Sequence, residues 1–167
     1  MGLLASTLGA SSLITRKEAL AASYPGAAIE AERVFLTEEQ VAETATLSGV
    51  TPPRALVARY VARLDGEVVG RAYVDTHVVR TKRESLLVSL GPDGRVKRID
   101  VTAFLEPREY RVSEAWMRQY DGRLLDDDLD LQRAIRPIAG ATLTAVATNE
   151  AVRRVLAIDR VLGSARR

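Results

Sequence analysis

Residues 55–79 read ALVARYVARLDGEVVGRAYVDTHVV, and this stretch decides the fold class. Its first half alternates with a period of two, which predicts a strand over residues 55–64. On that strand one face would carry Leu56, Ala58, Tyr60, Ala62 and Leu64. Asp65 and Gly66 form the dipeptide of a two-residue hairpin turn, and residues 68–79 return as the next strand. The stretch therefore predicts an antiparallel β-hairpin.

The flanking segments extend this hairpin into a larger sheet. Residues 85–90 and 96–105 are strand-like, and the turn sequence Gly91-Pro92-Asp93-Gly94 separates them. Upstream, residues 28–36 also alternate and predict a strand. We therefore expect a meander of antiparallel strands.

Helical signals lie on both sides of the meander. Thr15 with Glu18, and Thr37 with Gln40, are capping-box pairs that predict helices to about residues 22 and 47. Residues 113–120 predict a short helix anchored in the core by Trp116. Residues 144–162 carry apolar side chains at helical spacing. The fold class is therefore α+β: an antiparallel β-meander with short flanking helices and a C-terminal amphipathic helix, forming a single domain over residues 15–167.

The composition excludes several classes of function. The net charge is only +2, from 24 basic and 22 acidic residues, and aromatic residues make up 5%, which argues against nucleic-acid binding. The chain has no cysteine and one histidine, His77, so thiolate catalysis, iron–sulfur clusters and histidine metal sites are excluded. Any electron transfer would need an organic cofactor.

Residues 1–14 are apolar and rich in small side chains, but they have no basic residue. The segment is too short to cross a bilayer and lacks the basic start of a secretory signal. Two interpretations stay open: a disordered N-terminus, or the remnant of a signal peptide that begins upstream.

The segment from Pro137 to Thr144 reads PIAGATLT and leads directly into the C-terminal helix. Gly140 gives the backbone freedom, and the alanines on either side leave room for a ligand. Free N–H groups at a helix start favour a phosphate, to which Thr142 and Thr144 can also donate. On these grounds alone an ordinary helix N-cap is the better interpretation, because Gly-Ala-Thr before a helix usually is one.

From about residue 15 to residue 162 the sequence resembles the FMN-binding domain family. This family includes flavin-carrying subunits of sodium-translocating NADH:quinone reductase and of ferredoxin:NAD⁺ reductase complexes. The resemblance rests on Ala139-Gly140-Ala141-Thr142-Leu143-Thr144 before the helix, and on residues 74–81 and 104–110, which look like stand-alone soluble members. It implies that FMN is joined through its phosphate to Thr142 and that the neighbouring residues of the segment contact the cofactor.

Two positions depart from the family pattern. Arg136 stands where the family commonly has Asp, and Ala139 stands where it has Ser or Thr. Arg136 could instead pair with a flavin phosphate, because its planar fork suits phosphate oxygens. Glu106 is expected at the mouth of the cofactor site with Tyr110, and His77 is either a flavin contact or a half-buried strand histidine. Arg80, Lys82 and Arg83 would face solvent, the FMN phosphate or a membrane surface.

The sequence thus predicts an FMN-binding electron-transfer domain, a redox carrier rather than a stand-alone catalyst. The expected partners are a flavin transferase for maturation and a redox protein or membrane electron-transport complex. An extracytoplasmic location, periplasmic or at the cell envelope, is expected with them. The alternative is a degenerate FMN-binding fold without covalent flavin that serves as a ligand-binding or assembly module.

Overall fold

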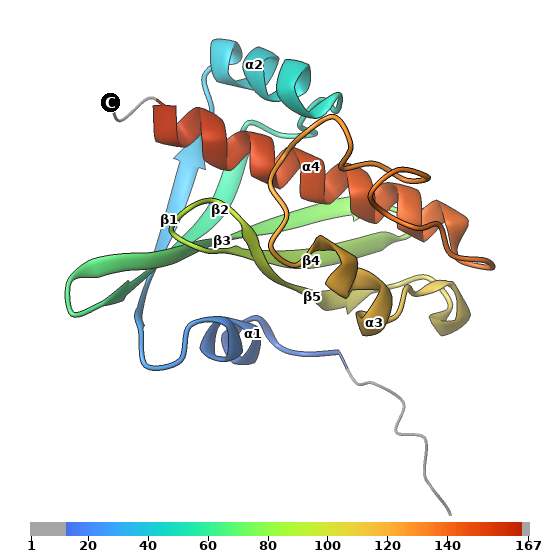
Figure 1. Ribbon diagram of the computed structural model, residues 1–167, viewed down its shortest axis with the longest axis horizontal. Helices are drawn as coiled ribbons and strands as arrows, with labels where there is room; N and C mark the ends of the chain where they lie inside the picture. Colours follow the sequence, from blue (N-terminus) through green and yellow to red (C-terminus); the bar gives the residue numbers. More distant parts are fainter. Residues whose placement is uncertain (1–12, 165–167) are drawn as a thin grey trace, which may run out of the picture.

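A single antiparallel sheet forms the centre of the computed structural model, which describes residues 13–164 (Figure 1). Its strand order follows the chain, β1-β2-β3-β4-β5, and the sheet is open. The strands are β1 (Ala28–Phe35), β2 (Leu56–Leu64), β3 (Glu67–Val78), β4 (Arg83–Leu90) and β5 (Val96–Phe104). The predicted α+β meander is confirmed, and the segment over residues 28–36 joins it as an edge strand next to β2.

The hairpin between β2 and β3 forms as the sequence predicts. Asp65 and Gly66 both have positive φ, 50° and 85°, which is the backbone of a type I′ turn. Leu64 therefore pairs with Glu67 directly across the turn. The register shifts once at a bulge between Ala62 and Arg63.

The predicted helices also form. Both capping boxes are present, at the start of α1 (Arg16–Ser23) and of α2 (Glu38–Ser48), and α2 ends at Gly49 with positive φ. Residues 113–120 form α3 (Glu114–Met117) and the 3₁₀ turn η2 (Arg118–Tyr120), preceded by η1 (Arg108–Tyr110). The long last helix is α4 (Thr142–Ser164), which begins two residues earlier than the sequence predicts.

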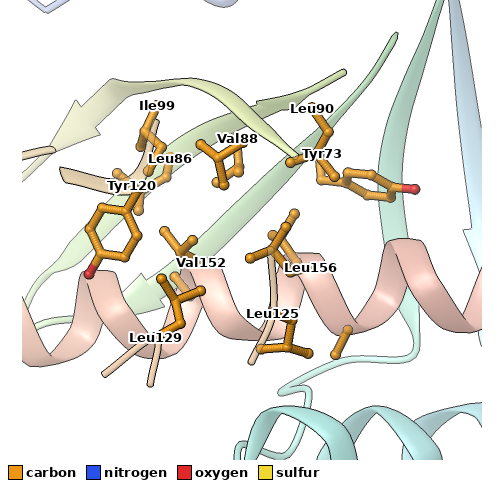
Figure 2. Close-up of a cluster of buried hydrophobic side chains, with 14 of the residues drawn as sticks. Tyr73, Leu86, Val88, Leu90, Ile99, Tyr120, Leu125, Leu129, Val152 and Leu156 are labelled. Carbon is orange, nitrogen blue, oxygen red and sulfur yellow. The ribbon is translucent and has the colours of Figure 1, made fainter. Parts of the chain in front are cut away.

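Helix α4 lies along one face of the sheet, with α2 beside it, and α1 lies on the other face (Figure 1). The main core fills the space between sheet and α4. Figure 2 shows Val88 of β4 and Ile99 of β5 on the sheet side, with Val152 and Leu156 of α4 opposite them. Trp116 is buried against Tyr120 in this core, so its predicted core role is confirmed.

The predicted face of the strand over residues 55–64 is only partly right. Tyr60 and Ala62 do pack against α1, but Leu56 and Leu64 are exposed, and the other face supplies Val57 to the main core. Helices cover parts of both sheet faces, so apolar residues stand on both sides of β2 and alternation cannot identify the core side. The prediction for residues 1–14 falls outside the described residues, except for Leu13 and Ile14.

Polar side chains fix α4 over β3. Arg71 donates from Nε and Nη2 to the carboxylate of Asp159 at 2.5 and 2.9 Å, and the Tyr73 hydroxyl donates to it at 2.7 Å. Nearer the start of α4, Arg154 donates twice to Asp75, both times at 2.8 Å. These bonds hold α4 at one position along β3, and with it the loop that precedes the helix.

Candidate functional site

The segment before α4 turns sharply at Gly140. Its φ of +82° lies in the left-handed region, which side chains other than glycine rarely adopt. A Cβ there would meet nothing within 4 Å, so the backbone angle, rather than lack of space, requires glycine. Ala141 and Thr144 are buried and anchor the segment, while Thr142 and Leu143 are exposed. The segment therefore presents Thr142 at the surface on a fixed backbone.

The two threonine hydroxyls do not cap the helix. The Thr144 hydroxyl donates to the backbone oxygen of Tyr110 at 2.5 Å, which ties α4 to η1. The Thr142 hydroxyl has only a long contact of 3.5 Å to the oxygen of Ile138. The N-cap position before Thr142 is held by Ala141, whose side chain cannot accept a hydrogen bond. No threonine hydroxyl of the segment therefore caps α4, but the segment still forms an ordinary helix start, so both interpretations of it stay open.

A hollow of about 210 Å³ opens at this point. Its lining comprises residues 140–144 together with Arg80 and Tyr110. The Arg80 guanidinium lies 5.1 Å from the centre of the Tyr110 ring, a cation–π distance. The hollow therefore brings together a cation, an aromatic ring and the exposed Thr142 hydroxyl at the start of a helix.

Glu106 supports the hollow from behind. Its Oε1 accepts hydrogen bonds from the backbone N–H groups of Arg80, Thr81 and Lys82 at 3.2, 2.8 and 2.9 Å. The N–H donors of Thr81 and Lys82, followed by that of Arg80, hold the pKa of the Glu106 carboxyl below its ordinary value. Glu106 thus fixes the turn that carries Arg80 and is not among the residues that line the hollow.

Arg136 and Ala139 lie on the loop that approaches the hollow. The Arg136 N–H donates to Gln119 Oε1 at 2.8 Å, and its carbonyl accepts from Trp116 Nε1 at 2.7 Å. Its guanidinium is exposed and makes no ion pair within residues 13–164. Neither residue lines the hollow.

His77 lies under α4 in a second polar cluster. Its Nδ1 is 2.9 Å from Asp75 Oδ1, and its Nε2 is 3.0 Å from Glu84 Oε2, which Thr148 of α4 also approaches at 3.4 Å. Burial lowers the pKa of His77, but hydrogen bonds and charge from Asp75 and Glu84 outweigh it and raise the pKa to about 9. The raised pKa favours a protonated imidazole at neutral pH, placed between the side-chain oxygens of Asp75 and Glu84.

The structure divides the predicted site residues into three groups, of which Arg136, Ala139 and Glu106 form the one that neither lines the hollow nor joins the His77 cluster. It brings Gly140, Ala141, Thr142, Leu143 and Thr144 together in the hollow, and it places His77 in the separate cluster under α4. The contribution of Asp75, Glu84 and Arg154 to that cluster was missed from the sequence. The available signal was the alternation of Arg71, Tyr73, Asp75 and His77, which puts polar side chains on one face of β3.

A scan of the sequence against protein-family models found no match, and comparisons with curated proteins and with solved structures found none either. The resemblance to the FMN-binding domain family therefore remains a prediction. Within residues 13–164 no helix is long and apolar enough to cross a membrane. The same residues contain no group of three His, Asp or Glu side chains that could hold a metal ion.

Proposed function

We propose that this protein carries FMN at the start of α4, attached through its phosphate to Thr142, and passes electrons to or from a redox partner. The observation that carries the proposal is the exposed Thr142 hydroxyl in a hollow that also contains the Arg80 guanidinium. The Gly-Ala-Thr segment alone would not support it, because small residues before a helix are common.

The residues present suit the phosphate end of FMN. Arg80 offers a guanidinium, Thr142 offers a hydroxyl, and the first turn of α4 offers N–H groups at the positive end of the helix dipole. At about 210 Å³ the hollow is smaller than the pockets of about 300–1,000 Å³ that enclose whole ligands. It therefore suits a phosphate and part of the ribityl chain, and would leave the isoalloxazine ring at the surface.

Each residue then has a definite task. Arg80 neutralises the phosphate, Glu106 holds Arg80 in place through its turn, and Thr144 keeps α4 against η1. Bound flavin would supply one- and two-electron redox chemistry. A ring left at the surface suits a carrier that must approach its donor and acceptor. A membrane electron-transport complex or redox protein outside the cytoplasm is the partner class that we propose with it.

The ester at Thr142 needs an activated flavin donor, because direct condensation with FMN would have to release water. In the balanced step, the Thr142 Oγ forms a bond to the flavin-side phosphorus of a flavin dinucleotide. The pyrophosphate bond breaks, a nucleoside monophosphate leaves, and the hydroxyl proton passes to solvent. A flavin transferase is the proposed catalyst, and the exposure of Thr142 makes the hydroxyl accessible to it.

A second candidate is a degenerate FMN-binding fold without covalent flavin, used for ligand binding or assembly. The exposed Arg136 guanidinium favours it, because a cation there reverses the charge of the acidic residue that the family commonly has. The same side chain could also pair with the phosphate of FMN bound without a covalent bond.

Mass spectrometry of protein made together with a flavin transferase distinguishes these candidates. We expect a mass increase of FMN minus water on the peptide that contains Thr142, lost in Thr142→Ala and kept in the remote control Thr46→Ala. Flavin that is released on denaturation, with no adduct, would indicate non-covalent binding. Protein that is colourless, unmodified and unable to bind added FMN would refute both flavin proposals.

A further inference from the structure

The sheet face opposite α4 is only half covered. Helix α1 packs there on Ala62, Ala72 and Leu87, with Val74 at the border of the contact. Beyond Val74, towards the turn between β3 and β4, Thr76, Val78 and Arg83 on this face are exposed. This half of the face is therefore open to solvent.

Strand register shows which side chains share this surface. Phe35 pairs with Leu56, and Val78 pairs with Arg83. Paired residues lie on the same face, and neighbours along a strand alternate, so Val78 and Arg83 point away from the side of His77 and Glu84. Leu105, whose N–H donates to the Arg83 oxygen at 2.9 Å, follows the same alternation. We call Arg33, Phe35, Leu56, Val78, Arg83 and Leu105 the open-face patch.

The apolar members of the open-face patch are strongly exposed. Phe35 is 72% exposed, Leu105 59%, Val78 56% and Leu56 45%. They stand on β1, β2, β3 and the end of β5, so the open-face patch crosses the sheet. Four strand spacings of about 4.8 Å give it a width of about 19 Å. Phe35 lies beside Leu56, and Val78 and Leu105 lie on either side of Arg83, so exposed apolar side chains are grouped on this face and mark an interaction surface.

The charges on this surface have one sign. Arg33 and Arg83 belong to the open-face patch, and Arg80 and Lys82 lie in the adjoining turn; none of the four has an ion pair within the described residues. Two carboxylates near this surface are occupied. Asp100 accepts from Arg98 at 2.8 Å, and Glu106 accepts from the backbone of the turn. The surface is therefore apolar and cationic.

We propose that the open-face patch docks this protein on an anionic lipid bilayer. Apolar side chains would enter the boundary between headgroups and acyl chains, while Arg33, Arg83 and Lys82 would contact anionic headgroups. A bilayer suits this surface better than a protein segment does, because the patch is broad and runs over all the strands, whereas the hollow of about 250 Å³ that Arg33 and Leu56 help to line lies only at its β1–β2 side.

This docking would also position the hollow. Arg80 borders the open-face patch and lines the hollow, so the start of α4 would lie near the headgroups. That consequence rests on the proposed flavin function, since it would bring the cofactor close to membrane donors or acceptors. The docking itself requires no flavin and is tested on flavin-free protein.

Co-sedimentation of the flavin-free full chain with vesicles tests the proposal. The vesicles are phosphatidylcholine alone, or phosphatidylcholine mixed with phosphatidylglycerol. We expect binding to the mixed vesicles that weakens in high salt. Arg83→Gln should lower the partition coefficient about fivefold, as expected for one basic residue near an anionic surface. Phe35→Ser should lower it by roughly tenfold or more through lost apolar insertion.

Two matched controls lie away from the open-face patch. Leu64→Ser removes an exposed apolar side chain beside the β2–β3 turn, at the opposite end of the sheet from Val78 and Arg83, and Arg123→Gln removes an exposed cation on a loop. Both should bind vesicles as the unaltered protein does. Circular dichroism would establish that all four variants are folded.

No binding to mixed vesicles, equal binding to both vesicle types, or equal loss in the controls would overturn the proposal. Binding to an acidic polypeptide but not to vesicles would also overturn it, in favour of a protein partner.

Discussion

Replacing His77 with glutamine should change how the stability of the protein depends on pH. His77 lies between Asp75 and Glu84, 2.9 and 3.0 Å from their oxygens, and it is largely buried under α4. Glutamine is similar in length and keeps a hydrogen-bonding group, but it cannot carry a positive charge. The substitution therefore removes the charge of the bridge with little change in volume.

The magnitude follows from the pKa of His77, which is 6.5 in its ordinary state and about 9 in the folded protein. At about 1.4 kcal/mol for each pH unit, the protonated bridge contributes about 3 kcal/mol to the free energy of unfolding. Because the folded pKa is the higher one, this contribution is complete below pH 6.5. It is lost as the pH rises through 9.

Urea unfolding at a series of pH values from 6 to 9.5 measures the effect, followed by the fluorescence of Trp116, the only tryptophan. We expect His77→Gln to be less stable by about 3 kcal/mol at pH 6 and for the difference to shrink towards pH 9.5. Other groups titrate in both proteins, so their contributions cancel in the difference between the two free energies of unfolding. A difference that stays constant with pH, or grows as the pH rises, would refute the protonated bridge.

Three further substitutions test separate features. Arg154→Met should leave the buried Asp75 carboxylate with His77 as its remaining charged partner and cost about 1–3 kcal/mol in urea unfolding; Arg154→Met with Asp75→Asn should recover part of it, and an undiminished loss would argue against the pair. Glu106→Gln should speed amide hydrogen exchange at residues 80–82, because a neutral amide accepts their N–H groups less strongly; unchanged exchange would contradict its role. Gly70→Ala should lower the free energy of unfolding by about 1–3 kcal/mol, because the added Cβ would overlap Tyr24 and the Leu90 carbonyl. Gly163→Ala is the control: its added Cβ would meet nothing within 4 Å, so it should not lower the melting temperature.

Local signals in the sequence were sufficient to predict the helices, strands and turns of the fold. The capping boxes at Thr15 and Thr37 and the turn at Asp65-Gly66 each place their hydrogen-bonding groups within a few residues. Such features depend on short-range chemistry, so the sequence alone predicts them. The start of α4 was displaced by two residues, because no side-chain cap marks it.

The candidate site was predictable only in part. Residues 139–144 are contiguous, so the sequence shows them together, whereas the lining by Arg80 depends on a turn held by Glu106 from a distant strand. The cluster of His77 was missed for the same reason, since Arg154 comes from the last helix and Glu84 from the next strand. Alternation along β2 failed because both faces of that strand are partly covered.

The two ion pairs between β3 and α4 have opposite polarity: the arginine is on β3 in one pair and on α4 in the other. This affects how the helix packs onto the sheet during folding. On β3 Arg71 precedes Asp75 along the chain, and on α4 Arg154 precedes Asp159. Because the helix runs antiparallel to the strand, each arginine meets the aspartate of the other element. If the helix shifted along the strand far enough to bring Arg154 to Arg71, it would set two cations against each other. Apolar contacts alone would allow α4 to shift along β3. The charge pattern instead raises the free energy of folding intermediates in which the helix is misaligned. The two ion pairs therefore select one position of α4 along β3 as the chain folds.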